Sequence, residues 1–145
     1  AKKSTSLMVF EELENIYLSE QSIKNFSKNC LRNIENIQRL VTKISDSGKT
    51  IYCYGATAKG NTLLNSAKID NRTIKACVDS TDIKQGKFLP GSRIPIISEE
   101  DAFSNWPDFF LLTAWNYRDE IISKVRRSGN FHTRFIIPFP NVHVN

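Results

Sequence analysis

The segment Gly55–Thr62, GATAKGNT, joins two glycines to a lysine and an amide, a combination that suits anion binding where a strand turns into a helix. Its glycine spacing matches the P-loop pattern, but Asn61 occupies the position of the essential lysine, so we do not expect triphosphate hydrolysis. In the dinucleotide pattern G-x-G-x-x-G, Thr57 replaces the second glycine and would obstruct a pyrophosphate. We predict that backbone N–H groups, Lys59 and Asn61 contact a ligand phosphate or sugar hydroxyl, with Asn61 donating its amide or capping the helix. The alternative is that the glycines only allow tight packing between strand and helix.

Polar and aromatic residues also follow the other predicted strands. Asp79 lies where a dinucleotide fold places its ribose-binding acid, and it either accepts from a ligand hydroxyl or caps a turn. Lys84 and Gln85 lie in a long connection of the kind that is often functional, although a solvated lysine is the alternative. Trp115 could stack on a sugar or base, cover an interdomain surface or pack in the core. Asn116 is predicted to face the ligand.

The spacing of apolar residues predicts an α/β fold. We expect a helical connector at 1–47, with a shorter helix at 4–19, and a Rossmann-like domain at 48–145. In that domain short apolar runs alternate with helical patterns, which predicts a parallel sheet of four or five strands with flanking helices. Ligands of such sheets bind beyond the carboxyl ends of the strands. Strands are predicted at 50–54, 73–78, 108–114 and 134–138, and helices at 61–67, from 99 and at 117–127.

Several local features complete this prediction. Residues 80–97 are rich in turn formers and are predicted to form a long connection without a strand. Ser98 precedes three acids and is predicted to be an N-cap. Tyr117 is expected to pack at the start of a helix, and His143 to lie in a tail that can be disordered.

Composition and charge exclude several classes of protein. The chain has 145 residues, enough for one compact domain, and a net charge of +5 from dispersed basic residues. No run of lysine and arginine alternates with aromatics, so we expect no nucleic-acid partner. No apolar run approaches the roughly 20 residues that cross a bilayer and we expect no leader peptide, which predicts a cytoplasmic protein without a membrane partner. The three cysteines lack C-x-x-C spacing and are expected to be buried, reduced thiols that bind no metal.

Four blocks of sequence, over roughly residues 49–141, carry a family resemblance. They read YGATAKGNTLLN, VDSTDIKQGKFLPGSRIPI, PDFFLLTAWNYRDEI and RFIIPFP. In this order they resemble the C-terminal domain of S-adenosylmethionine-dependent sugar C-methyltransferases, which methylate a carbon of a nucleotide-linked deoxysugar.

The resemblance implies how such an enzyme is divided. A full family member is similar in having a zinc module, a methyltransferase domain that binds S-adenosylmethionine, and a Rossmann-like C-terminal domain that helps hold the nucleotide-linked sugar. The family's catalytic residues belong to the middle domain, and this chain resembles only the third part. We therefore expect it to bind no cofactor, to transfer no methyl group alone, and to work with a methyltransferase domain in the same polypeptide or a separate subunit.

Fold position and family pattern together name the candidate substrate-binding residues. They are Gly55, Ala58, Lys59, Gly60, Asn61, Asp79, Lys84, Gln85, Trp115 and Asn116. Two other functions stay open: a stand-alone, non-enzymatic module that binds or regulates through a small ligand, and an NAD-dependent oxidoreductase. The side chain at Thr57 and the lack of a Tyr-x-x-x-Lys pair count against the oxidoreductase.

Overall fold

The computed structural model describes residues 5–17 and 19–145, and the chain divides into two compact units, Ala1–Arg32 and Asn33–Asn145. The first unit holds α1 (Thr5–Tyr17) and the beginning of α2 (Glu20–Asp46). The short helix predicted over 4–19 corresponds to α1, although residues 4 and 18 lie outside the described residues. The second unit contains the rest of α2 and the whole sheet.

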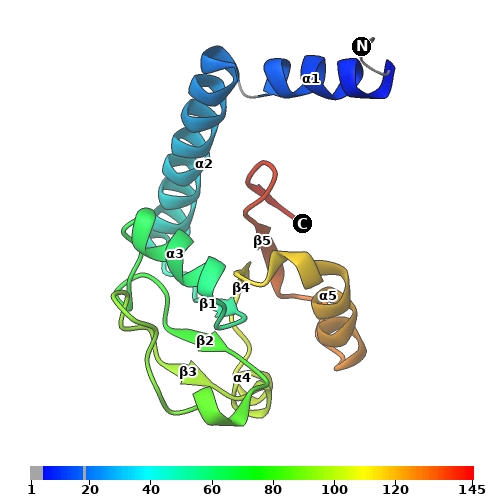
Figure 1. Ribbon diagram of the computed structural model, residues 1–145. Helices are drawn as coiled ribbons and strands as arrows, with labels where there is room; N and C mark the ends of the chain where they lie inside the picture. Colours follow the sequence, from blue (N-terminus) through cyan, green and yellow to red (C-terminus); the bar gives the residue numbers. More distant parts are fainter. Residues whose placement is uncertain (1–4, 18) are drawn as a thin grey trace. The chain divides into compact units, whose positions relative to one another are not determined.

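In the described part of the chain, six strands form one sheet in the order β3-β2-β1-β4-β5-β6 (Figure 1). The strands are β1 (Ile51–Tyr54), β2 (Ala76–Val78), β3 (Ile96–Ile97), β4 (Phe109–Leu112), β5 (Arg134–Ile137) and β6 (His143–Val144). The first five are parallel and β6 is antiparallel to β5. The predicted Rossmann-like fold is confirmed, and the order of the strands reverses between β1 and β4.

Two of the six strands lie where the sequence predicted none. β3 falls in the connection 80–97, where Cys77 donates its backbone N–H to Pro95 and pairs with Ile96. β6 contains His143, so the expectation of a disordered tail is wrong. Each of these strands has only two residues, which is too short to give an alternating pattern in sequence.

Helices cover both faces of the sheet because side chains alternate along each strand. Ile51 and Cys53 of β1 pack in a core with buried residues of α2 and of α3 (Ala58–Ser66). Tyr52 and Tyr54 point to the other face and pack with α4 (Glu99–Ser104) and α5 (Arg118–Arg127). Ser98 accepts a hydrogen bond from the Asp101 N–H, which confirms it as the N-cap of α4. Single-turn 3-10 helices precede α5 at Trp115–Tyr117 (η2) and follow β2 at Asp82–Lys84 (η1).

The turn from β1 to α3 approaches the end of β4 so closely that two glycines are required. Gly55 has φ +101°, a region that favours glycine, and a Cβ there would overlap the Cβ of Ala114. Gly60 is buried in α3, and a Cβ there would lie 2.5 Å from the Cβ of Thr113. The two glycines therefore set the distance between α3 and the end of β4.

Replacement of Gly60 by alanine tests this contact. At a helical position with no close neighbour, the change would stabilise the fold by about 0.5–1 kcal/mol, because glycine is a poor helix former. Here we expect the free energy of unfolding to fall by about 1–3 kcal/mol, since the new methyl group meets Thr113. Urea unfolding followed by circular dichroism measures the change. Ser66→Ala, at the exposed end of the same helix, is the matched control, and equal stability of the two variants would contradict the argument.

Candidate functional site

The N-terminus of α3 is fixed by threonines of two elements. The Thr57 hydroxyl accepts a hydrogen bond from the Gly60 N–H at 3.0 Å and donates to the Thr113 carbonyl at 3.1 Å. Thr113 in turn places its hydroxyl 2.6 Å from the carbonyl oxygen of Gly55. The prediction that Asn61 caps this helix is wrong, because α3 begins at Ala58 and Thr57 is its N-cap. A threonine before the first turn is itself a capping signal that identifies the correct start.

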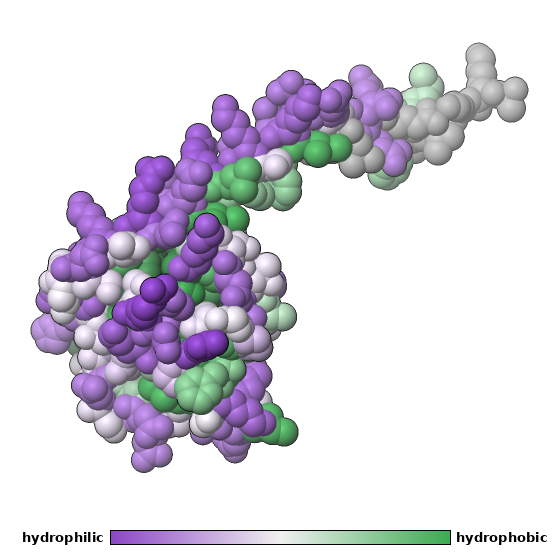
Figure 2. Space-filling model, turned by 90° about the vertical axis from the view of Figure 1, so that its left-hand side faces the viewer, coloured by the Kyte–Doolittle hydropathy of each residue, from purple (hydrophilic) through white to green (hydrophobic). Residues whose placement is uncertain are grey.

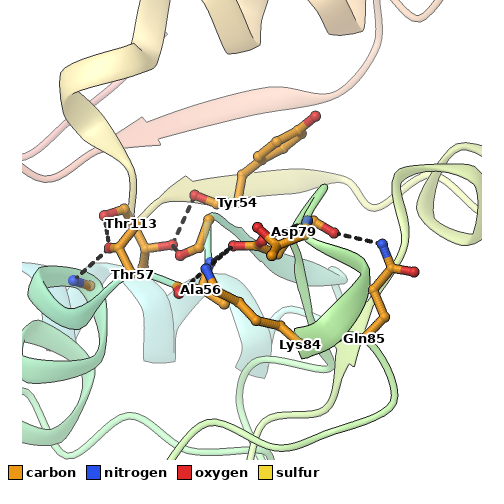
Figure 3. A network of polar contacts seen from close by, with 10 residues as sticks. Tyr54, Ala56, Thr57, Asp79, Lys84, Gln85 and Thr113 are labelled. Carbon is orange, nitrogen blue, oxygen red and sulfur yellow. Dashed lines mark hydrogen bonds and ion pairs between the residues drawn. The ribbon is translucent and has the colours of Figure 1, made fainter.

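Asp79 joins the ends of β1 and β2 (Figure 3). Its buried carboxylate accepts from the Ala56 N–H at 2.7 Å and the Thr81 N–H at 2.9 Å. Lys84 completes the group, since its ammonium lies 3.2 Å from the carboxylate and donates to the Ala56 carbonyl at 3.0 Å. Gln85 donates its side-chain amide to the Asp79 carbonyl at 3.1 Å. The three predicted residues Asp79, Lys84 and Gln85 are therefore brought together.

This network holds a charged carboxylate in the fold. Burial by itself would raise the pKa of Asp79, but the hydrogen bonds from Thr81, Ala56 and Lys84 outweigh burial and the pKa is lowered. Lys84 is engaged by Asp79 and Ala56, so the alternative of a solvated loop lysine is wrong. The turn-capping alternative for Asp79 agrees with its bond to Thr81, two residues later.

A second group of predicted residues lies on the α3 side of the sheet. The Lys59 ammonium lies 5.0 Å from the centroid of the Trp115 ring, a cation–π distance. Trp115 is half-buried and packs against Phe139, with ring centroids 4.8 Å apart. Lys59 and Asn116 are both exposed. This cation–aromatic pair presents a charge and a π surface together.

The remaining predicted residues have varied surroundings. Ala58 is exposed as the first residue of α3. Asn61 is half-buried, and its Oδ1 is buried with no hydrogen-bond partner among the described residues. A buried amide oxygen without a partner is uncommon in folded proteins.

A pocket of about 250 Å³ opens where the strand order reverses, on the side of α4 and α5. Gly55 and Asp79 line it, as predicted for the strand ends. The rest of its polar lining comes from residues that the sequence did not single out as a site: Tyr54, Thr57, Ser80, Thr81, Glu99, Tyr117, Glu120 and Lys124. The expectation that Tyr117 packs at the start of a helix is wrong, because its side chain is 62% exposed at this pocket.

Inside the pocket, one chain of hydrogen bonds joins three elements. The Tyr54 phenol donates to Glu99 Oε1 at 2.6 Å, and the Lys124 ammonium donates to the same oxygen at 2.8 Å. Burial, then the hydrogen bond to Glu99 and then nearby carboxylates raise the pKa of Tyr54, so the phenol stays protonated. These three residues are far apart in sequence, and only the strand order brings them together.

The described residues contain neither a candidate membrane span nor a candidate metal site. None of the helices in the described ranges is both long enough and apolar enough to cross a bilayer. Over the same ranges, no three histidine, cysteine or acidic residues gather where they could hold a metal ion.

Residues 1–140 match the family described as the C-methyltransferase C-terminal domain. The chain belongs to this family. The C-methyltransferase NovU of Streptomyces niveus is 40% identical over 137 residues, which cover 94% of this chain and 33% of that protein. The chain thus spans about a third of the length of this relative, as expected for one domain of a larger C-methyltransferase.

The extent of the family match adds to the sequence prediction. The four blocks that carry the resemblance span roughly residues 49–141, whereas the family match covers residues 1–140. The helices before the sheet are therefore part of the C-methyltransferase C-terminal domain as the family defines it.

Replacement of Asp79 by asparagine tests the network at the strand ends. We expect the free energy of unfolding to fall by about 1–3 kcal/mol at neutral pH, because the Ala56 N–H, the Thr81 N–H and Lys84 lose a charged acceptor. The lowered pKa of Asp79 means that its carboxylate stabilises the fold above the unfolded-state pKa, about 3.9, and that this contribution is lost as pH falls below it.

The measurement is urea unfolding between pH 7 and pH 3 for the parent chain and for Asp79→Asn. The difference between them should shrink toward pH 3. Asp82→Asn, an exposed acid three residues later, should leave stability within about 0.5 kcal/mol. A constant difference across the pH range would mean that the charge of Asp79 does not stabilise the fold.

Proposed function

We propose that this domain binds the substrate of an S-adenosylmethionine-dependent C-methyltransferase that acts on a nucleotide-linked deoxysugar. The observation that carries the proposal is the pairing of Lys59 with Trp115 at the carboxyl end of the sheet. An indole ring can stack on a nucleobase or sugar, and a neighbouring ammonium can pair with a diphosphate. The exposed amide of Asn116 adds a donor and an acceptor beside them.

The chemistry of C-methylation explains why a separate binding domain is useful. A base must remove a proton from a carbon beside a sugar carbonyl, and that carbon then attacks a sulfonium methyl group, which breaks the S–C bond. S-adenosylmethionine supplies this methyl group. Contacts with the remote nucleotide can hold the reacting carbon in place, and we assign that task to Lys59, Trp115 and Asn116.

The residues of this chain do not fit a dinucleotide-type cofactor pose. The carboxylate of Asp79, which would accept from a ribose, is already engaged by Ala56, Thr81 and Lys84. The Thr57 side chain stands at the pyrophosphate turn, and it already accepts from the Gly60 N–H. We therefore expect S-adenosylmethionine to be held outside this chain, and we derive no step through NAD.

An apolar helix face supports a protein partner for this domain. Ile23, Phe26 and Leu31 of α2 are all exposed, as are Met8 and Phe10 of α1. Figure 2 shows green, hydrophobic side chains along this helical segment, which otherwise carries purple, hydrophilic ones. Exposed apolar surface of this kind marks an interaction site. Because the chain spans about a third of its relative, we expect the methyltransferase domain to cover this face.

We also place the protein in the cytoplasm. All three cysteines are free thiols, and Cys53 and Cys77 are buried side by side in the sheet without a disulfide. Reduced thiols are the usual state in the cytosol.

Calorimetric titration of the chain with dTDP, dTDP-glucose, S-adenosylmethionine and NAD tests substrate binding. We expect dTDP and dTDP-glucose to bind, and Lys59→Ala to weaken both by about tenfold because a charge-assisted contact to phosphate is lost. Asn116→Ala should also weaken binding, by a smaller factor. Lys68→Ala, an exposed lysine after α3, is the matched control for Lys59.

The outcomes separate the candidate functions. Tight binding of NAD with no binding of dTDP would overturn the proposal in favour of an oxidoreductase. If none of the four ligands binds, the titration is repeated on the protein that carries the methyltransferase domain, and failure there also overturns it.

A charged side chain introduced on the apolar face of α2 tests the proposed contact with the methyltransferase domain. In the protein that carries both domains, Phe26→Glu should lower methyl transfer and the melting temperature of the assembly, because a carboxylate would be buried at the contact. Phe131→Glu is the matched control, since both phenylalanines are 71% exposed. In the isolated chain neither substitution should change stability, and equal effects of both in the larger protein would argue against an interface at Phe26.

A further inference from the structure

The pocket on the α4 and α5 side has a polarity opposite to that of the Lys59–Trp115 pair. It is lined by the carboxylates of Asp79, Glu99 and Glu120 and by one ammonium, Lys124. Lys84 pairs with Asp79 and Lys124 pairs with Glu99, so the charge of Glu120 leaves the pocket net negative. The negative field is felt by Tyr54, because Glu99, Asp79 and Glu120 all act to raise the pKa of its phenol after burial and hydrogen bonding. A phosphate group would be repelled from this pocket.

Several polar groups in the pocket have hydrogen-bonding capacity to spare. Within the described ranges, no hydrogen bond or ion pair engages the carboxylate of Glu120 or the hydroxyl of Ser80, and both side chains are exposed. Glu99 accepts from Tyr54 and Lys124 mainly through Oε1, so its Oε2 can accept a further donor. The pocket therefore offers more acceptors than donors.

The apolar part of the lining has the shape of a stacking site. Tyr117 is 62% exposed and offers its aromatic ring, and Val78, Ala114 and Ile121 supply apolar surface. The volume of about 250 Å³ is enough for one sugar ring, and the pocket opens to solvent, so the rest of a ligand can extend out of it. A ring with hydroxyl or amino donors on its edge and C–H groups on its faces matches both parts of the lining.

In Figure 3 the Tyr54 ring points away from Lys84 and Gln85. Asp79 and Thr81 of the network line the pocket, whereas Lys84 and Gln85 do not. Lys59 and Trp115 belong to the face that α3 covers, whereas Tyr54, Glu99 and Lys124 belong to the face of α4 and α5. The two faces thus separate a cationic surface from an anionic pocket.

We propose that this pocket binds one uncharged or amino-substituted sugar ring of the ligand, through donors to Glu99 and Glu120 and stacking on Tyr117. This rests on the proposed function, which places the anionic part of the same ligand at Lys59. The ring is either the deoxysugar or the pentose of the nucleoside, since both carry the hydroxyl donors that the pocket recognises. The pocket thereby selects against a ligand turned end for end, because its carboxylates repel the diphosphate.

The test compares ligands that carry each ring. The full chain is titrated with thymidine, dTDP and dTDP-glucose, in the parent form and as Glu120→Gln, Tyr117→Leu and Lys59→Ala. Glu120→Gln should lower the affinity for the ligand whose ring occupies the pocket by about tenfold, because a charged hydrogen-bond acceptor is lost. If the hexose is bound, only dTDP-glucose is affected; if the pentose is bound, all three ligands are. Glu100→Gln, an exposed acid of α4 outside the pocket, should change nothing.

The titrations give different results if the pocket proposal fails and if the proposed function fails. If Lys59→Ala weakens binding while Glu120→Gln and Tyr117→Leu leave every affinity unchanged, the substrate-domain proposal stands and the pocket proposal is overturned. If no nucleotide binds, methyl glucoside and glucosamine are titrated while the backbone amides of Thr81, Tyr117 and Glu120 are followed by NMR. Shifts confined to the pocket amides, and lost in Glu120→Gln, support the pocket alone; no shifts overturn it.

Discussion

The whole candidate site depends on how closely the β1–α3 turn approaches the end of β4. Side chains are excluded at Gly55 and Gly60, and the Thr57 and Thr113 hydroxyls bind across the contact. This contact lies where the strand order reverses, which is the position at which open α/β sheets bind ligands. The glycines therefore act as packing residues, and the ligand contacts that we propose belong to side chains that the packed turn carries.

Asp79 has a comparable role on the other side of the turn. It occupies the position of a ribose-binding acid, yet the fold uses its oxygens to hold Ala56, Thr81 and Lys84. Asp79 thus links the loop after β1 to the loop after β2 by hydrogen bonds. We propose that the ligand contacts lie instead with Lys59 and Trp115 on one face and with Glu99 and Glu120 on the other.

Much of the fold could be predicted from the sequence, because β1, β4 and β5 are apolar runs separated by helical patterns. The sequence also placed Asp79 at the end of a predicted strand and Lys84 in the connection after it, but it did not predict the ion pair between them. It could not predict the lining of the pocket, because Tyr54, Glu99 and Lys124 lie in three different elements and no local pattern links them. The apolar periodicity of α3 begins only at Leu63 and led to a start that was too late, whereas Thr57 was a local capping signal for the correct start.

The two edges of the sheet limit how copies of this domain can meet. β3 and β6 each have two residues, so neither edge offers a row of unpaired backbone groups long enough to template a strand from another molecule. The two aliphatic residues of β3 also follow a proline, Pro95, which has no N–H to donate. A domain with an apolar helical face would otherwise be prone to aggregate. Short edge strands leave that face free to associate while they block the extension of the sheet into a fibre.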